Sequence, residues 1–138
     1  MFKFKSFINY KLFNKLNKKL KNIVFYSEGQ EHDHFFLPFV QECLDQNIPF
    51  CYVSSEEKKP YIGNNYSNFF YIGKSFIRTL FFSTLECENL ITTTPDLHNF
   101  FLKKSSKCKN YIYFFHSMCS VNVIYNKNAF SHYDTILC

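Results

Sequence analysis

Residues 22–53 have the sequence NIVFYSEGQEHDHFFLPFVQECLDQNIPFCYV, in which two short apolar runs flank a longer amphipathic stretch. The runs at 22–26 and 48–53 are rich in β-branched and aromatic residues, as is typical of buried strands. Between them, the apolar residues of 31–46 recur at the spacing of one helix face, although Pro38 interrupts the stretch. This segment therefore predicts a strand, a helix and a second strand.

The same alternation continues along the rest of the chain. Strands that are apolar throughout and separated by helices are typical of a parallel sheet buried on both faces. The predicted fold class is therefore α/β and doubly wound, with helices on both faces of the sheet. The further strands are expected at 68–72, 89–93, 111–115 and 135–138, with helices at 74–85 and, starting from Pro95, at 95–103.

Residues 1–21 differ from the rest of the chain in charge. They contain seven lysines and no acidic residue, and because the whole chain has a net charge of +5, residues 22–138 have a net charge of −2. Phe4, Ile8 and Leu12 begin an apolar repeat with a spacing of four residues. The pattern predicts a basic amphipathic helix over 1–21, followed by a domain over 22–138.

Such a helix has two interpretations. It binds an anionic membrane surface through its lysines and apolar side chains, or it packs on its own domain with the lysines in solvent. Nucleic acid is not an expected partner, because the basic cluster is confined to this one helix. The lysines expected to contact lipid are Lys11, Lys15, Lys18 and Lys19.

Composition excludes several kinds of site. The chain has only three glycines, so neither of the common glycine-rich phosphate loops is present, and no cofactor is expected. Six cysteines without a paired spacing indicate reduced thiols in a cytoplasmic protein. His32 and His34 are two residues apart and do not share a helix face, so we expect no metal site there.

Polar side chains follow four of the predicted strands. In an open parallel sheet, ligands bind outside the carboxyl ends of the strands, so these side chains are the candidate site. Hydroxyls and carboxylates suit a polyol or sugar-phosphate ligand, whereas helix N-capping explains the same residue types without a ligand. A histidine at this edge is a candidate general base. The candidates are Ser27, Glu28, Ser55, Asp96, His116 and Ser117.

Several segments, in this order, resemble the N-terminal half of CDP-glycerol glycerophosphotransferases, which act in teichoic acid and related surface-polymer synthesis. They are FYSEGQ (25–30), YVSSE (52–56), TTTPDLHNFFLKKS (92–105), YIYFFHSMCS (111–120) and AFSHYDTILC (129–138). The resemblance implies the first of two facing Rossmann-like domains of a GT-B-type transferase. It also implies that the first domain holds the acceptor and the second binds the CDP-linked donor.

The reaction implied by this resemblance is the attack of a polyol or glycan hydroxyl on the donor phosphate, with release of CMP. His116 would be the general base, although it is followed here by Ser-Met-Cys-Ser where the family has Gly-Thr-Pro-Leu-Lys. Asp96 and Ser117 would contact the acceptor. The resemblance also suits a cytoplasmic protein attached peripherally to the inner face of the cell membrane.

Three functional hypotheses follow. The chain stops within the predicted strand at 135–138, so we expect the donor-binding half to lie outside it and the chain alone to be inactive. The second hypothesis is a non-catalytic α/β module that binds a polyol phosphate or a glycan. The third is a degenerate remnant of the transferase, with an exposed apolar interdomain face.

Overall fold

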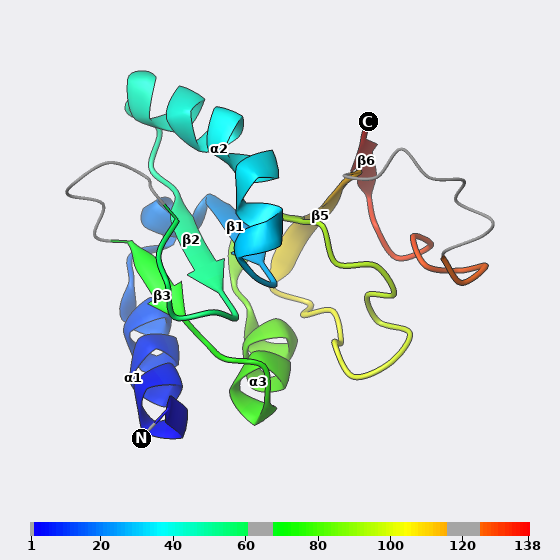
Figure 1. Ribbon diagram of the computed structural model, residues 1–138, viewed down its shortest axis with the longest axis horizontal. Coiled ribbons are helices and arrows are strands. Elements are labelled where there is room, and N and C mark those ends of the chain that lie inside the picture. Colours follow the sequence, from blue (N-terminus) through cyan, green and yellow to red (C-terminus); the bar gives the residue numbers. More distant parts are fainter. Residues whose placement is uncertain (1, 61–67, 116–124) are drawn as a thin grey trace.

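The computed structural model describes residues 2–60, 68–115 and 125–138 (Figure 1). The helices and strands follow the predicted order, except that the helix expected at 95–103 is missing. They are α1 (Phe2–Lys15), a 3-10 turn (Lys18–Lys21), β1 (Ile23–Ser27), α2 (Gln30–Asp45), β2 (Cys51–Ser54), β3 (Phe69–Tyr71), α3 (Phe76–Thr84), β4 (Cys87–Thr92), β5 (Cys108–Phe114) and β6 (Thr135–Leu137).

The six strands form one parallel sheet in the order β3-β2-β1-β4-β5-β6, which confirms the predicted Rossmann-like class. From β1 the chain adds β2 and then β3 toward one edge of the sheet. It then returns through α3 and places β4 on the other side of β1. Tyr26 of β1 is level with Thr92 of β4. The strand order therefore reverses between β1 and β4, and this switch point is where open α/β sheets bind ligands.

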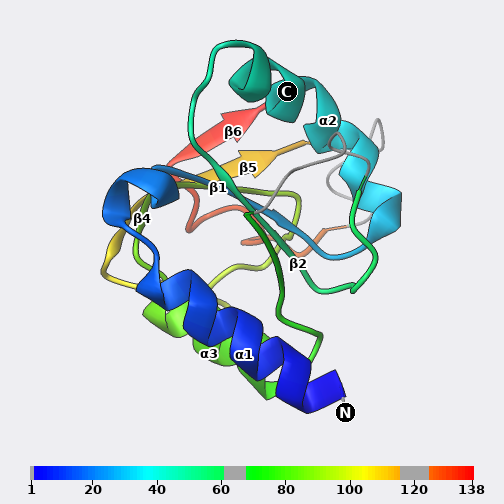
Figure 2. The same ribbon diagram turned by 90° about the vertical axis from the view of Figure 1, so that its left-hand side faces the viewer.

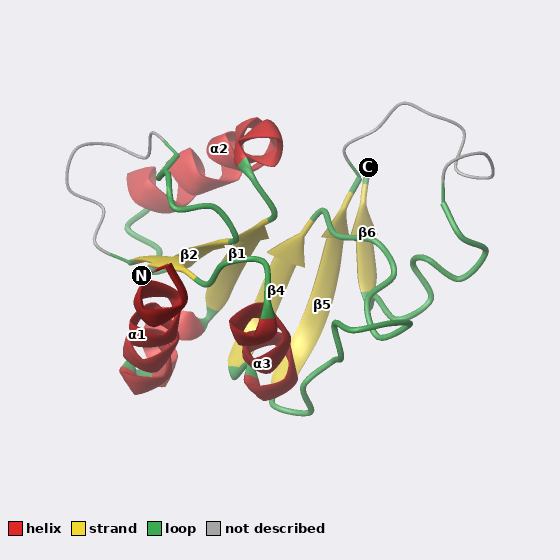
Figure 3. Ribbon diagram, turned by 60° about the horizontal axis from the view of Figure 1, so that its bottom comes forward, coloured by secondary structure: helices red, strands yellow, loops and turns green. Residues whose placement is uncertain are grey.

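Helices cover both faces of the sheet, as predicted. Figures 2 and 3 show α1 and α3 together on one face and α2 on the other. Alternate residues of β1 point to opposite faces, so Val24 and Tyr26 join the core under α1 and α3, while Phe25 joins the core under α2. None of the helices within the described ranges is long and apolar enough to cross a bilayer.

The prediction of one helix over 1–21 is wrong in two respects. The α-helix ends at Lys15, and a separate 3-10 turn follows Asn17, whose side chain accepts the backbone N–H of Lys19 at 3.0 Å. The face of α1 that packs on the sheet is Ser6, Tyr10 and Phe13, and not the repeat that starts at Phe4. A spacing of four residues exceeds the helical period of 3.6, so that repeat drifts around the helix.

The helix predicted at 95–103 is also wrong. Asp96 and His98 have positive φ angles of 59° and 68°, which a right-handed helix does not allow. The Asp96 N–H donates to the Ala129 carbonyl at 2.8 Å, and the His98 N–H donates to the Leu102 carbonyl at 2.7 Å. One of these bonds joins a segment 33 residues away and the other runs forward within the loop, and together they replace the helical hydrogen bonds.

Candidate functional site

A pocket of about 260 Å³ lies at the switch point of the sheet. Glu28 reaches it from the end of β1, Arg78 from the first turn of α3, and Thr94 and Asp96 from the loop after β4. Phe100, Phe101 and Leu102 of the same loop form its apolar wall. The residues that line the pocket are far apart in the sequence. The first, Glu28, and the last, Leu102, are separated by 74 positions.

Arg78 and Glu28 are two of the three charged residues that line the pocket, Asp96 being the third. An Nη of Arg78 lies 3.9 Å from a Glu28 carboxylate oxygen, and both side chains are partly exposed. The Arg78 Nε is buried and has no hydrogen-bond partner among the described residues. Burial raises the pKa of the neighbouring Tyr26 to about 12, so this hydroxyl stays neutral beside the guanidinium. The guanidinium is partly exposed, and its 3.9 Å contact with Glu28 is longer than a hydrogen bond, so an Nη of Arg78 can still donate to a ligand in the pocket.

Sequence reasoning missed Arg78, because it lies within a predicted helix and not after a strand. One signal was present, since Arg78 is the only arginine in a chain whose other strong bases are all lysines. Arginine, unlike lysine, has a planar fork of donors that matches phosphate and carboxylate oxygens. Its position in the first turn of the helix after β3 also places it near the carboxyl ends of the strands.

Asp96 is held in place by two asparagines. One carboxylate oxygen accepts the side-chain N–H of Asn126 at 3.1 Å, and the other accepts that of Asn99 at 3.4 Å. Asn126 comes from the described segment before β6, so this contact fixes the loop after β4 against a remote part of the chain. The carboxylate lines the pocket in a defined position, which agrees with its predicted place at the carboxyl edge.

Ser27 and Ser55 lie at the same edge but face inward. The Ser27 hydroxyl donates to the Gly29 carbonyl at 2.9 Å, and the Ser55 hydroxyl shares a hydrogen bond of 2.6 Å with the Tyr26 hydroxyl. Both serines are buried, so they shape the strand ends and do not line the pocket. The predicted base His116 and its neighbour Ser117 lie outside the described residues.

The N-terminus of α2 follows β1, where dinucleotide-binding sheets hold a phosphate. Here a carboxylate of the chain itself lies at this place, because Glu56 accepts the Gln30 N–H at 3.1 Å and contacts the Lys74 ammonium at 3.3 Å. A Cβ at Gly29 would lie 3.0 Å from the Glu56 carboxyl carbon. The position at the start of α2 is therefore filled by Glu56.

Replacing Glu56 by glutamine should weaken the start of α2 in a pH-dependent way. The Gln30 N–H, followed by Lys74, holds the pKa of the Glu56 carboxyl below its ordinary value. The stabilisation of the folded state by the Glu56 carboxylate is therefore complete above about pH 4.3, the pKa of a glutamate in the unfolded chain. It is lost as the pH falls through the lowered pKa of Glu56 in the folded chain. At neutral pH we expect a loss of about 0.3–1 kcal/mol in the free energy of unfolding, near the lower end because the side chain is a third exposed.

Urea unfolding at neutral and acidic pH measures this effect. The control is Glu88→Gln, which removes an exposed partner of Lys109 and no helix cap. A difference between Glu56→Gln and the unmodified chain that persists in strong acid would contradict the capping role.

The two histidines of α2 do not converge. The His32 ring lies 3.4 Å from the Thr93 hydroxyl, at the carboxyl edge, whereas the exposed His34 ring packs on Phe35 with centroids 3.9 Å apart. Across the described part of the chain, no group of three or more histidine, cysteine, aspartate or glutamate side chains could hold a metal ion.

Fold and site together define a Rossmann-like α/β protein with a small pocket at its topological switch point, lined by both charged and apolar side chains. Compared with protein-family models, with curated proteins and with solved structures, the chain matches none of them. The resemblance to the glycerophosphotransferases therefore rests on the sequence motifs and stays a prediction.

Proposed function

We propose that this chain is the acceptor-side part of a transferase that moves a glycerol-phosphate-like group from a CDP-linked donor to a polyol or glycan acceptor, with release of CMP. The observation that supports it best is the pocket at the switch point, which Arg78 lines together with the carboxylates Glu28 and Asp96. The proposal assigns the acceptor to this pocket.

The chemistry of the pocket suits a phosphorylated polyol. Carboxylates accept hydrogen bonds from the hydroxyls of a polyol, and the guanidinium donates to phosphate oxygens. The apolar wall of Phe100 and Phe101 offers a surface for the carbon chain. Pockets for drug-sized ligands have volumes of about 300–1,000 Å³, so a volume of about 260 Å³ suits a single polyol or sugar unit.

The same charges disfavour the donor. Two carboxylates and one guanidinium would surround a donor pyrophosphate with net negative charge, whereas a transferred phosphate needs positive groups and N–H donors. Glu56 already fills the helix N-terminus next to this edge. The donor therefore belongs to a second half of the enzyme, as the resemblance implies, and His116 stays the predicted base.

The alternative is a module that binds the same ligand without catalysis. It is favoured by the charges of the pocket at the switch point, where two carboxylates and one guanidinium disfavour a nucleotide phosphate. Both proposals predict the same binding to the pocket. They differ in that only the transferase, once joined by a donor-binding half, would release CMP from CDP-glycerol in the presence of acceptor.

Replacing Arg78 by methionine should weaken the binding of glycerol 3-phosphate to the 138-residue chain about 10- to 100-fold, because charge-assisted hydrogen bonds contribute about 1.5–3 kcal/mol. Methionine keeps much of the side-chain volume and removes the charge. Calorimetric titration measures the affinity, and thermal unfolding verifies that the variant is folded.

The matched control is Lys74→Met, which removes a cation four residues earlier whose partner is Glu56, outside the pocket. We expect this control to bind nearly as tightly as the unmodified chain. Equal binding by Arg78→Met and the unmodified chain would reject the assignment of the acceptor to this pocket.

A further inference from the structure

A second surface, on the opposite side of α1 from the core, exposes large apolar side chains. Phe4 of α1 and Phe76 of α3 are 70% and 71% exposed, and Phe7, Ile8 and Leu12 of α1 are also exposed. We call these five residues the α1–α3 surface. The helices α1 and α3 lie side by side on one face of the sheet (Figure 2), and Phe4, Phe7 and Phe76 line one groove between them.

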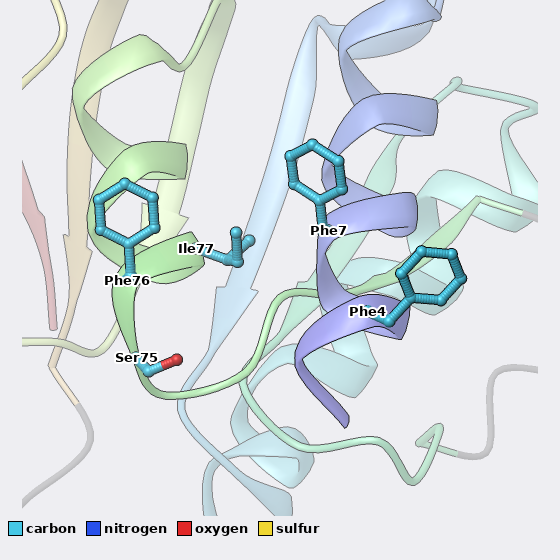
Figure 4. A pocket seen from close by; sticks show the side chains of 5 residues that line it. All are labelled: Phe4, Phe7, Ser75, Phe76 and Ile77. Carbon is cyan, nitrogen blue, oxygen red and sulfur yellow. The ribbon is translucent and has the colours of Figure 1, made fainter. Parts of the chain in front are cut away.

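An apolar groove of about 600 Å³ runs between the first turns of these helices. Figure 4 shows Phe4 and Phe7 on its α1 side and Phe76 and Ile77 on its α3 side, with Ser75 at one end. The groove is larger than the pocket at the switch point, but it contains no charged side chain. Its lining therefore suits a hydrocarbon chain and not a polar ligand.

Cations border this apolar surface. Lys11 and Lys15 are exposed on the outward side of α1, and the Lys11 ammonium lies 5.2 Å from the centre of the Phe7 ring. Among the other lysines of this region, Lys5 pairs with Glu57, and Lys18 pairs with Glu86 at 2.6 Å. Among the side chains of α1 and the following turn that the structure describes, Lys11, Lys15 and Lys19 are exposed and have no ion-pair partner. The predicted lipid contact of Lys18 would have to break an existing ion pair.

We propose that the α1–α3 surface binds an anionic phospholipid bilayer, with α1 lying in the plane of the interface. Phe4, Phe7 and Phe76 enter the boundary between headgroups and acyl chains, and Lys11 and Lys15 contact lipid phosphates. This interaction is independent of the acceptor pocket. It differs from the helix expected from sequence, because one side of α1 stays packed in the core while the other meets the membrane.

The charge of the surface favours a bilayer over a second copy of the chain. In a symmetric dimer the same patch meets itself, so Lys11 and Lys15 of two copies would lie near each other and repel. Residues 1–21 have no acidic residue that could compensate. An anionic bilayer supplies both the phosphates and the apolar layer that this surface requires.

Vesicle co-sedimentation tests the proposal. We expect the chain to bind vesicles of phosphatidylcholine and phosphatidylglycerol in equal parts, to bind phosphatidylcholine vesicles weakly, and to dissociate in high salt. Each lysine near an anionic surface raises the affinity for the vesicle about fivefold. The double substitution Lys11→Gln with Lys15→Gln should therefore lower this affinity at least about tenfold. Phe4→Ser with Phe76→Ser should lower it by a similar factor.

Matched controls lie elsewhere on the chain. Lys103→Gln with Lys127→Gln makes the same change in net charge away from α1, and Phe101→Ser removes an aromatic ring that is 82% exposed on the loop after β4. Both should bind vesicles like the unmodified chain, as should Arg78→Met, so the membrane proposal and the acceptor proposal can fail separately. All exposed-site variants should keep the melting temperature of the unmodified chain.

A spectroscopic probe is available because the chain has no tryptophan. The fluorescence of Phe76→Trp should shift to shorter wavelength on addition of the anionic vesicles, as the ring leaves water. Unchanged fluorescence, equal binding to both vesicle types, or unchanged binding by Phe4→Ser with Phe76→Ser would overturn the proposal. So would a dimer in light scattering that Phe76→Ser dissociates, in the absence of vesicle binding.

Discussion

Replacement of Phe13 by alanine is expected to destabilise the fold by about 3–5 kcal/mol, the usual cost of removing a buried phenylalanine. Phe13 is fully buried although it belongs to α1. Its ring packs edge-on against Phe70 of β3 and Phe81 of α3, with centroids 5.5 and 5.1 Å away. The Lys21 ammonium lies 5.4 Å from the same ring. Urea unfolding followed by circular dichroism measures the change.

The control for this prediction is Phe4→Ala, on the same helix. Phe4 is 70% exposed, so the substitution leaves the core intact and should change stability by less than about 0.5 kcal/mol. If the two variants were equally stable, α1 would not be packed on the sheet. In that case residues 1–21 would behave as a detachable helix, as the charge pattern alone suggests.

Replacement of Tyr52 by phenylalanine is expected to cost about 1–3 kcal/mol, because it leaves a buried carboxylate without its donor. The Tyr52 hydroxyl donates to an Asp33 carboxylate oxygen at 2.5 Å, and both side chains are buried between α2 and the sheet. Burial, together with Asp33, raises the pKa of Tyr52 far above its usual value, so the donor stays protonated. This bond ties α2 to β2.

Tyr10→Phe is the comparison for this second prediction. The Tyr10 hydroxyl shares a hydrogen bond of 2.8 Å with the Thr84 hydroxyl, between α1 and α3, and neither partner carries a charge. A neutral hydrogen bond contributes about 0.5–1.5 kcal/mol, so the loss should be smaller than for Tyr52→Phe. Equal losses in thermal unfolding would mean that the Asp33 carboxylate finds another donor when the Tyr52 hydroxyl is removed.

The strands were predictable because their signal is local. Runs such as 23–26 and 48–53 contain no charged or amide side chain, and only a strand covered on both faces buries such a run. The strand ends were less accurate. β5 begins at Cys108, three residues before the predicted start, because its polar residues Lys109 and Asn110 are exposed while the backbone still pairs with β4. Exposed positions within a paired strand carry no apolar signal.

The candidate site was predictable only in part. Glu28 follows β1 directly and Asp96 lies four residues after the end of β4, so the rule that ligands bind at carboxyl ends was enough to select them. Arg78 could not be selected in this way, because its approach to Glu28 depends on how α3 crosses from β3 to β4. The inward orientation of Ser27 and Ser55 likewise depends on hydrogen bonds that the residue types alone do not specify.

Pattern and composition were thus sufficient for the α/β class, for the parallel strands and for the basic character of the first helix. These properties depend on residue type and on periodicity, which each segment carries by itself. Three other features arise only when distant segments pack together. They are the buried face of α1, the left-handed backbone at Asp96 and His98, and the ion pair between Glu28 and Arg78. They are set by contact energies between remote residues, which outweigh local preference once the core has formed.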